Sequence, residues 1–369
     1  MKEIACFITS HGFGHATRTA AVIEALSRQQ RFIPRLFAST GESLFHPTLK
    51  RYIYHHRLTD IGFCQKDSFR IDWQKTAAEL ESLLPYSEAT IGELVRMCRN
   101  CCYVLCDISA LGIVVAARLG VPSVLIENFT WDWFYAVQQD PDRRLESFGQ
   151  YLKSIYRLAD IHIQTQPVCS PRSVDLCCAP IYRRARSPVV KVRQDLPGAG
   201  RKRVLITMGG LGFSSDFLEE MHALPEYFFL IAGQPQQYQP CENVLMLAQS
   251  DSFYHPDLIG GVDIVVFKSG YSTLAECRQA GTASICVQRQ GFAESPVLEH
   301  YAQKHLGSHI LSQDDFVSGR WLRTLPQLIL QAPAPATVNG ADQVADYLLQ
   351  RSDLWGTTTL KTSPPHLEA

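Results

Sequence analysis

The first residues of the chain predict a strand, a tight turn and a helix in immediate succession. Residues 4–9 are apolar enough for a buried strand, and apolar residues recur at helical spacing over 17–28. Between these segments stands Ser10-His-Gly-Phe-Gly-His15, with two glycines and two histidines. Glycine lets a backbone approach a ligand closely, and an imidazole accepts a proton near neutral pH. In an open parallel sheet such a turn lies at the carboxyl ends of the strands, where α/β proteins bind ligands.

Strand and helix patterns then alternate along the first half of the chain, which predicts a doubly wound parallel sheet. Residues 183–203 interrupt the alternation, because they carry many basic residues together with prolines and glycines that are typical of a linker. The alternation then resumes. The expected strands are 4–9, 33–38, 103–107, 123–127, 161–165, 203–207, 227–232, 244–247, 264–267 and 283–287, and the expected helices are 17–28, 76–99, 110–119, 147–158, 216–222, 272–280 and 340–350.

The predicted fold class is α/β, with two Rossmann-like doubly wound domains that face a central cleft. Each half opens with a glycine-rich turn after its first strand, so ligands are expected between the two domains. The expected division is an N-terminal domain over 1–185, a linker over 186–202, a second domain over 203–335, a C-terminal helix over 336–356 and a disordered tail over 357–369.

Charge and composition exclude several classes of partner. The formal net charge is −1, so the chain carries no strong signal for nucleic acid. No apolar run approaches the roughly 20 residues of a transmembrane helix, and residues 4–9 are too short for the apolar part of a signal peptide. We therefore expect a cytoplasmic protein. The sequence is silent on its oligomeric state.

The 12 cysteines are expected to be reduced thiols, in agreement with a cytoplasmic location. The cluster Cys98, Cys101, Cys102 and Cys106 has two interpretations. It could hold zinc, or it could be ordinary core where a helix passes into a strand. No second cysteine pair follows at zinc-finger spacing, so we expect no metal.

Two motifs in the second half are candidate nucleotide sites. Gly209-Gly-Leu-Gly212 follows a strand, and its N–H groups could hold a diphosphate, although a plain tight turn has the same pattern. A second helix start brings further hydroxyl and N–H groups, from Ser269, Gly270, Ser272 and Thr273. Glu276, one turn later, could accept hydrogen bonds from the hydroxyls of a ribose. The alternative is a helix N-cap in which Glu276 is the capping-box partner.

Three further segments end strands with polar or aromatic residues. Asp107 could orient His15 or His11 if the two strands are neighbours, or it could cap the next helix. Residues 127–133 hold three aromatic residues and two carboxylates, which suit a sugar ligand or a hydrophobic cluster under a loop. Residues 289–294 are either ligand-binding groups or a charged surface loop.

In combination these motifs resemble those of GT-B glycosyltransferases. The likeness is greatest to the glycosyltransferase-like N-terminal region of plant-type L-arabinokinases and their stand-alone bacterial relatives. The first turn also resembles, more distantly, that of the peptidoglycan N-acetylglucosaminyltransferase, a glycine-rich turn that ends in the histidine matched by His15. The resemblance covers most of residues 4–321 and rests on His11-Gly-Phe-Gly-His-Ala-Thr-Arg18, Asn128-Phe-Thr-Trp-Asp-Trp-Phe-Tyr135, Gly270-Tyr-Ser-Thr-Leu-Ala-Glu276, the loop 289–296 and Ser318-Gly-Arg-Trp321.

The resemblance implies roles for these residues. His15 would be the general base that deprotonates an acceptor hydroxyl, with Asp107 as its partner. Glu276 would hold the ribose of a nucleotide-diphosphate sugar, and Glu294 its sugar. The donor diphosphate would be held by Gly209, Gly210, Gly212, Ser269, Gly270, Ser272 and Thr273, and the acceptor by His11, Gly12, Phe13, Asn128, Trp131 and Asp132.

The leading hypothesis is a metal-independent glycosyltransferase that uses a nucleotide-diphosphate sugar, with UDP as the favoured nucleotide. The donor is a co-substrate, no other cofactor is expected, and the acceptor is a small molecule or a glycan. Helix N-termini would stabilise the departing diphosphate in place of a metal. The alternatives are a nucleotide-sugar hydrolase or epimerase on the same fold, and a non-catalytic module that binds a sugar nucleotide.

Overall fold

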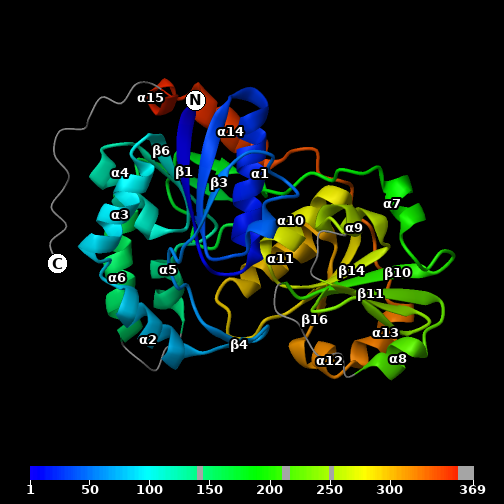
Figure 1. Cartoon of the computed structure of the whole chain (residues 1–369). Helices are drawn as coiled ribbons and strands as arrows, with labels where there is room; N and C mark the ends of the chain where they lie inside the picture. Colours follow the sequence, from blue (N-terminus) through cyan, green and yellow to red (C-terminus); the bar gives the residue numbers. More distant parts are fainter. Residues whose placement is uncertain (139–143, 210–216, 249–252, 356–369) are drawn as a thin grey trace. The chain divides into compact units, whose positions relative to one another are not determined.

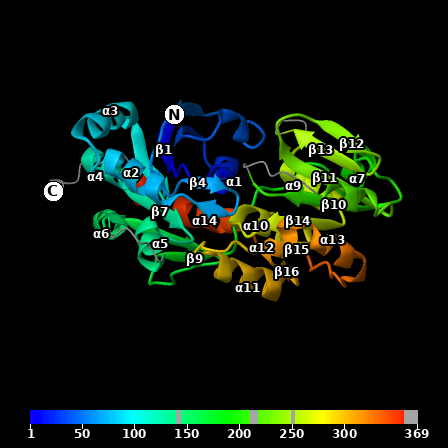
Figure 2. The same ribbon diagram turned by 90° about the horizontal axis from the view of Figure 1, so that it is seen from below.

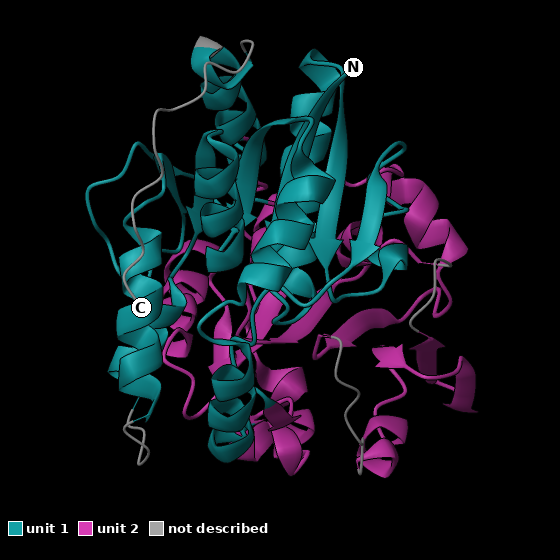
Figure 3. Ribbon diagram, turned by 60° about the vertical axis from the view of Figure 1, so that its left-hand side comes forward, with its two compact units in different colours: residues 1–64, 71–181, 338–369 teal, residues 65–70, 182–337 magenta. Residues whose placement is uncertain are grey.

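The computed structural model describes residues 1–138, 144–209, 217–248 and 253–355. The chain forms two compact units, which Figure 3 shows in different colours. Unit 1 comprises residues 1–64, 71–181 and 338–369, and unit 2 comprises residues 65–70 and 182–337. Residues 65–70 thus belong to the second unit, and residues 338–369 belong to the first, although the sequence predicted consecutive domains. The predicted disordered tail, 357–369, lies outside the described residues.

Unit 1 is built on a seven-stranded, wholly parallel sheet in the order β3-β2-β1-β6-β7-β8-β9. The order reverses beside β1, which pairs with β2 on one side and β6 on the other. Its elements are β1 (Lys2–Ile8), α1 (Phe13–Gln29), β2 (Phe32–Ala38), the 3-10 helix η1 (Glu42–Leu44), β3 (Ile53–His56), α2 (Trp73–Leu83), α3 (Glu88–Cys98), β6 (Cys101–Asp107), α4 (Ala110–Leu119), β7 (Ser123–Glu127), α5 (Trp131–Val137), α6 (Arg144–Tyr156), β8 (Ile161–Thr165), β9 (Leu176–Cys178), α14 (Gly340–Gln350) and α15 (Ser352–Trp355).

Unit 2 repeats this plan with the order β12-β13-β11-β10-β14-β15-β16, which can be followed in Figure 2. Only β12 is antiparallel to its neighbour, and the order reverses beside β10. Its elements are α7 (Val189–Asp195), β10 (Lys202–Thr207), α8 (Leu218–His222), β11 (Tyr227–Gln234), β12 (Tyr238–Cys241), β13 (Val244–Ala248), α9 (His255–Gly261), β14 (Ile264–Lys268), α10 (Tyr271–Ala280), β15 (Ala283–Val287), α11 (Ser295–Leu306), β16 (His309–Leu311), α12 (Gln313–Val317), α13 (Arg320–Thr324) and η2 (Leu325–Gln327); a separate two-stranded piece is made by β4 (Gln65–Asp67) and β5 (Arg70–Ile71).

Helices cover both faces of each large sheet. In unit 1, α1 and α14 lie side by side on one face, and α4 packs on the other (Figure 1). Helix α14 returns to this unit because Val344, Ala345 and Leu348 are buried against the same apolar cluster as α1. In unit 2, one apolar cluster joins the sheet to α9, α10 and α11, and a second joins it to α12 and α13. The predicted α/β class with two parallel Rossmann-like sheets is confirmed.

Two expected elements differ from the structure. The single helix predicted over 76–99 is wrong, because α2 and α3 are separate helices on either side of Pro85. Proline lacks the N–H and clashes with the preceding turn, so a helix does not continue through it. The segment expected as a linker, 186–202, contains α7, whose Val192 is buried with Leu196 in an apolar cluster of unit 2.

The cysteine cluster extends from Cys98 at the end of α3 along β6. Cys101 and Cys106 are five positions apart on this strand, which separates them by about 16 Å. Cys101 and Cys102 are successive strand residues, so their side chains point to opposite faces. One zinc ion cannot reach all four thiols at bonding distance. Burial raises the pKa of Cys102 to about 11, which favours the protonated thiol.

In the parts of the chain that the structure describes, no helix combines the length and apolar character needed to span a bilayer.

The return of α14 depends on a glycine. A Cβ at Gly340 would lie 2.0 Å from the carbonyl oxygen of Ala179, which is backbone. Gly340→Ala is therefore expected to lower the free energy of unfolding by about 2–3 kcal/mol, measured by urea denaturation. The matched control is Gly92→Ala in α3, where the nearest atom to the new Cβ is an Arg96 nitrogen at 3.7 Å. Equal stability of the two variants would contradict the close approach.

Candidate active site

The reversal of strand order in unit 1 places two of the predicted residues together. Asp107 is the last residue of β6 and pairs in register with Ile8, the last residue of β1. His15 lies in the first turn of α1, directly after β1. Its Nδ1 is 2.8 Å from Oδ1 of Asp107. The expected pairing of Asp107 with His15 is therefore present, and Asp107 does not serve as a helix cap.

The contact with Asp107 determines which nitrogen of His15 carries the proton. An ionised carboxylate only accepts hydrogen bonds, so Nδ1 of His15 is the donor to Asp107. Nη2 of Arg18 lies 3.1 Å from the same nitrogen and donates to the carboxylate instead. Nε2 is then the basic nitrogen, and it makes no hydrogen bond to any residue that the structure describes. The side chain of His15 is 10% exposed. This is the arrangement in which a buried carboxylate orients an imidazole for proton transfer.

Arg18 and Thr19 complete the surroundings of Asp107. Arg18 donates from Nε to Oδ2 at 2.7 Å and from Nη2 to Oδ1 at 2.5 Å, and the Thr19 hydroxyl donates to Oδ2 at 3.1 Å. Burial acts to raise the Asp107 pKa, but the Arg18 guanidinium and His15 outweigh it and lower the pKa to about 2. Asp107 therefore stays ionised at physiological pH. Sequence reasoning gave Arg18 no role, although its spacing of three from His15 on one helix places both on the same face.

The residue after Asp107 has a strained backbone. Ile108 is buried with φ at 59°, a region that β-branched side chains rarely enter. Its N–H donates to the Ile126 carbonyl at 3.2 Å, and its carbonyl accepts from the Tyr156 hydroxyl at 2.7 Å. Such strain persists only where surrounding contacts enforce it, and it gathers at functional sites.

Asp60 anchors the first turn from the other side. Its carboxylate accepts from the Thr9 hydroxyl at 2.7 Å, the Ser10 N–H at 2.9 Å and the Trp131 indole at 3.2 Å. Burial raises the Asp60 pKa, and the Thr9 and Ser10 hydrogen bonds partly oppose this rise. Sequence reasoning missed Asp60, because nothing in its own segment indicates a partner 50 residues away.

The residues expected to bind an acceptor fall into two groups. Asn128 and Trp131 are each 1% exposed. Arg18 donates to the Asn128 side chain, and Trp131 packs among Phe63, Phe129 and Phe134. For Trp131 the structure thus favours the alternative of a hydrophobic cluster. The other group lies near His15 in sequence or has an unsatisfied polar atom. The His11 ring contacts Phe63 at a tilt, Gly12 precedes α1 at φ 71°, and Phe13 begins α1. Oδ1 of Asp132 is buried without a hydrogen bond among the described residues.

Unit 2 has its own reversal of strand order, between β10 and β14. Gly209 follows β10 with φ at 74°, and Lys268 ends β14. A Cβ at Gly209 would lie 3.2 Å from Nζ of Lys268, so the ammonium group sits against this turn. Ser269 is fully buried, Gly270 is the N-cap of α10, and Ser272 and Thr273 are half-buried in its first turn. Gly210 and Gly212 lie outside the described residues.

Lys268 belongs to a buried cluster with Arg289 and Glu294. Arg289 is 3.5 Å from Oε1 of Glu294, donates to the Ser68 carbonyl and stacks on Phe292. Burial, reinforced by Arg289, lowers the pKa of Lys268 to about 7, and burial lowers that of Arg289 to about 10. Burial also raises the Glu294 pKa. Oε2 of Glu294 makes no hydrogen bond to another described residue. Two basic side chains and an unsatisfied carboxylate oxygen therefore form one cluster, and Lys268 lies against the Gly209 turn.

Glu276 lies in a buried ion-pair network of unit 2. Its Oε1 accepts from Nε of Arg183 at 2.9 Å, and Oε2 is 2.7 Å from Nδ1 of His255. Burial acts to raise its pKa, but Arg183 and His255 lower it. No side-chain cap is present at α10, so the capping-box alternative is wrong. With 1% exposure and both oxygens engaged, Glu276 holds together three segments of unit 2 rather than presenting a free carboxylate.

Across residues 1–138, 144–209, 217–248 and 253–355, no group of three or more His, Cys, Asp or Glu side chains could hold a metal ion.

No family model matches the chain. L-arabinokinase from Arabidopsis thaliana is 25% identical over 372 residues, which cover 94% of this chain and 34% of that protein. The chain therefore spans about a third of the length of this relative.

Solved glycosyltransferases share the fold at low sequence identity. A UDP-glucosyltransferase from Polygonum tinctorium is 13% identical with a TM-score of 0.60, covering 96% of this chain and 99% of that one. MurG from Acinetobacter baumannii is 15% identical with a TM-score of 0.56, covering 95% and 100%. The glycosyltransferase SsfS6 from Streptomyces sp. SF2575 is 14% identical with a TM-score of 0.53, covering 96% of each chain.

These likenesses confirm both the fold and the resemblance that the sequence motifs indicated. The chain has the GT-B glycosyltransferase fold, and it is a distant homologue of L-arabinokinase.

Proposed function

We propose that the protein transfers a sugar from a nucleotide-diphosphate sugar, with UDP as the favoured nucleotide, to a hydroxyl group of a small-molecule or glycan acceptor. The observation that carries this proposal is the pair formed by His15 and Asp107, in which Nε2 of His15 is left unbound at the carboxyl end of β1. The pair is assembled for proton transfer, which activation of a hydroxyl requires. The solved UDP-glucosyltransferase on the same fold supports the choice of donor.

In the proposed reaction, Nε2 of His15 takes the proton of the acceptor hydroxyl while the oxygen attacks the anomeric carbon of the donor. The bond between that carbon and the diphosphate oxygen breaks, and the nucleoside diphosphate leaves. Asp107 stabilises the imidazolium that forms. His11, Gly12, Phe13 and Asp132 are the proposed acceptor contacts, and Asn128 and Trp131 support them from within the fold.

The donor would bind in unit 2. Lys268 and Arg289 supply positive charge for the diphosphate, together with the N–H groups of the Gly209 turn and of the first turn of α10. No metal is required in this proposal, because these cations and N–H groups would supply the positive charge that stabilises the departing diphosphate. Glu294 offers an unsatisfied oxygen to the hydroxyls of the donor sugar. Glu276 remains the proposed contact of the donor ribose, with its carboxylate held by Arg183 and His255. The other proposed donor contacts are Gly209, Gly210, Gly212, Lys268, Ser269, Gly270, Ser272, Thr273, Arg289 and Glu294.

We also propose a cytoplasmic location. All 12 cysteines are free thiols in the structure, which agrees with a reducing compartment.

Removal of the proposed base tests the mechanism. His15→Ala is expected to lower kcat for UDP release from UDP-sugar in the presence of acceptor by about 100-fold or more, with little change in KM for the donor. The matched control is His46→Ala, whose side chain is 53% exposed in unit 1. Near wild-type turnover by His15→Ala would remove His15 from the mechanism. UDP release with water alone as acceptor would favour the hydrolase, and nucleotide binding without turnover would favour the non-catalytic module.

The Asp107 carboxylate also links folding to pH. Its folded pKa of about 2 lies below the unfolded value of about 3.9, so its contribution to stability is present above pH 4 and is lost as the pH falls towards 2. The difference in unfolding free energy between wild type and Asp107→Asn is expected to shrink by about 2 kcal/mol over that window. Denaturation in urea at pH 5 and pH 2.5 measures it. A difference that does not change with pH would contradict the low pKa.

Lys268 predicts a pH dependence of donor binding. Its pKa is about 7 in the free protein, so the amine is largely neutral at pH 8 and must gain a proton to bind a diphosphate. UDP affinity is expected to fall by up to about tenfold per pH unit above 7. Lys268→Met should bind UDP more weakly and lose this dependence, whereas Lys153→Met, which removes an exposed lysine from α6, should keep it. Titration calorimetry at pH 7 and pH 9 measures both. An unaltered pH profile in Lys268→Met would contradict the assignment.

A further inference from the structure

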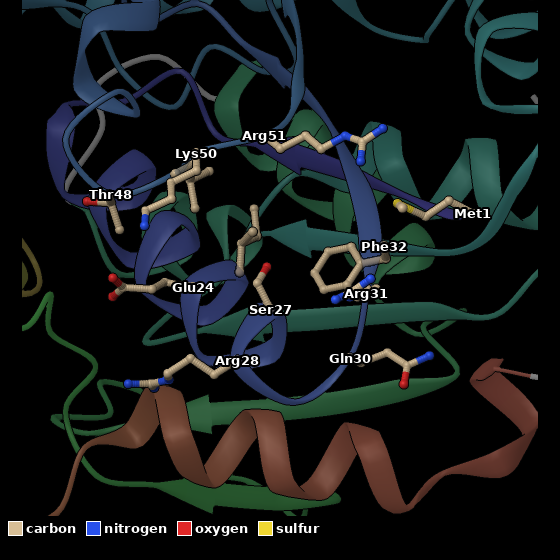
Figure 4. A pocket seen from close by; sticks show the side chains of 12 residues that line it. Met1, Glu24, Ser27, Arg28, Gln30, Arg31, Phe32, Thr48, Lys50 and Arg51 are labelled. Carbon is tan, nitrogen blue, oxygen red and sulfur yellow. The ribbon is translucent and has the colours of Figure 1, made fainter.

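A basic pocket lies at the end of unit 1 opposite to His15 and Asp107. It has a volume of about 520 Å³ and is lined by the C-terminal half of α1, the connection from α1 to β2 and the loop 48–51 (Figure 4). Strand β1 runs from Lys2 to Ile8, which separates its two ends by about 20 Å. The pocket contains Met1 and Phe32 from the amino ends of β1 and β2, so it is separate from the candidate active site. Its volume is within the range of small-molecule sites.

The charge of the pocket is strongly one-sided. Four cationic side chains line it, from Arg28, Arg31, Lys50 and Arg51, against the single carboxylate of Glu24. Figure 4 shows these cations on different sides of the pocket. Arg28 is paired with Asp342 of α14. Among the residues that the structure describes, the other three cations have no hydrogen bond or ion pair.

Three unpaired cations around one pocket repel one another. An anion bound between them would relieve this repulsion and gain charge-assisted hydrogen bonds, since arginine presents a planar fork of donors that matches phosphate. A phosphate monoester carries close to two negative charges at neutral pH, which suits several cations better than a single carboxylate does.

The inner wall of the pocket is apolar. Ile23, Phe32 and Leu49 line it and are at most 7% exposed. An apolar wall with cations around it suits a ligand that combines a flat or apolar portion with a phosphate. Glu24, the one carboxylate of the lining, can accept hydrogen bonds from hydroxyl groups of such a ligand.

We propose that this pocket binds an organic phosphate of about mononucleotide size. The phosphate lies among Arg31, Lys50 and Arg51, and the apolar portion of the ligand lies on Ile23, Phe32 and Leu49. The site is independent of the proposed glycosyl transfer. Helix α1 joins the two regions, because it has His15 in its first turn and Arg28 in its last.

Titration calorimetry with AMP as the probe tests the pocket on the full chain. We expect saturable binding, weakened about tenfold or more in the double variant Arg31→Gln/Arg51→Gln, because two charge-assisted contacts are lost. The matched control is Arg96→Gln/Arg99→Gln, which removes two exposed arginines from the region of α3 and should change affinity by less than about twofold.

A further variant distinguishes AMP binding in this pocket from binding at the donor site in unit 2. In Lys268→Met, whose donor site is weakened, the AMP binding that depends on Arg31 and Arg51 should persist, since Lys268 does not line the pocket. Three results would overturn the proposal: no saturable AMP binding, equal affinity in wild type and Arg31→Gln/Arg51→Gln, or loss of AMP binding in Lys268→Met. Circular dichroism of each variant verifies folding, and the substituted arginines are exposed, so their loss leaves the core intact.

Discussion

The buried carboxylate of Asp107 is the interaction on which the candidate site depends. It joins the end of β6 to the first two turns of α1 through His15, Arg18 and Thr19. Burial of a carboxylate is costly unless cations and donors surround it, and here both oxygens are satisfied. The same contacts orient the imidazole and leave its second nitrogen unbound. The strained backbone of Ile108 directly after Asp107 shows that the fold tolerates a local cost to keep this geometry.

The two units use one plan for different chemistry. Each has its first strand beside the reversal of strand order, with a glycine in the turn that follows. In unit 1 this position holds an imidazole and a carboxylate, which is a proton-accepting pair. In unit 2 it holds Lys268 and Arg289, which are cations suited to an anion. This contrast agrees with the proposed function, in which unit 1 activates the acceptor and unit 2 binds the diphosphate of the donor.

Prediction from the sequence succeeded where the signal is local or follows from sheet topology. Helices α4 and α14 and strands β7, β8 and β15 have the predicted bounds. His15 and Asp107 could be paired in advance, because parallel strands present their carboxyl ends at one edge. Prediction failed where distant segments meet. Arg183 and His255 pair with the Glu276 carboxylate, and Phe63 and Phe134 pack against Trp131. No local pattern in the sequence predicts these contacts.

By itself the sequence determined the class of fold, the alternation of strands and helices, and the two glycine turns at which polar side chains collect. These follow from periodicity and from the backbone freedom of glycine, which are properties of short segments. Only the tertiary structure decided which carboxylates have an unsatisfied oxygen and which have both oxygens engaged in ion pairs. The tertiary structure also decided that α14 packs in unit 1. It also decided that Arg31, Lys50 and Arg51 surround one pocket. Charges and hydrogen bonds act over a few ångströms, so their partners are known only when the chain has brought them together.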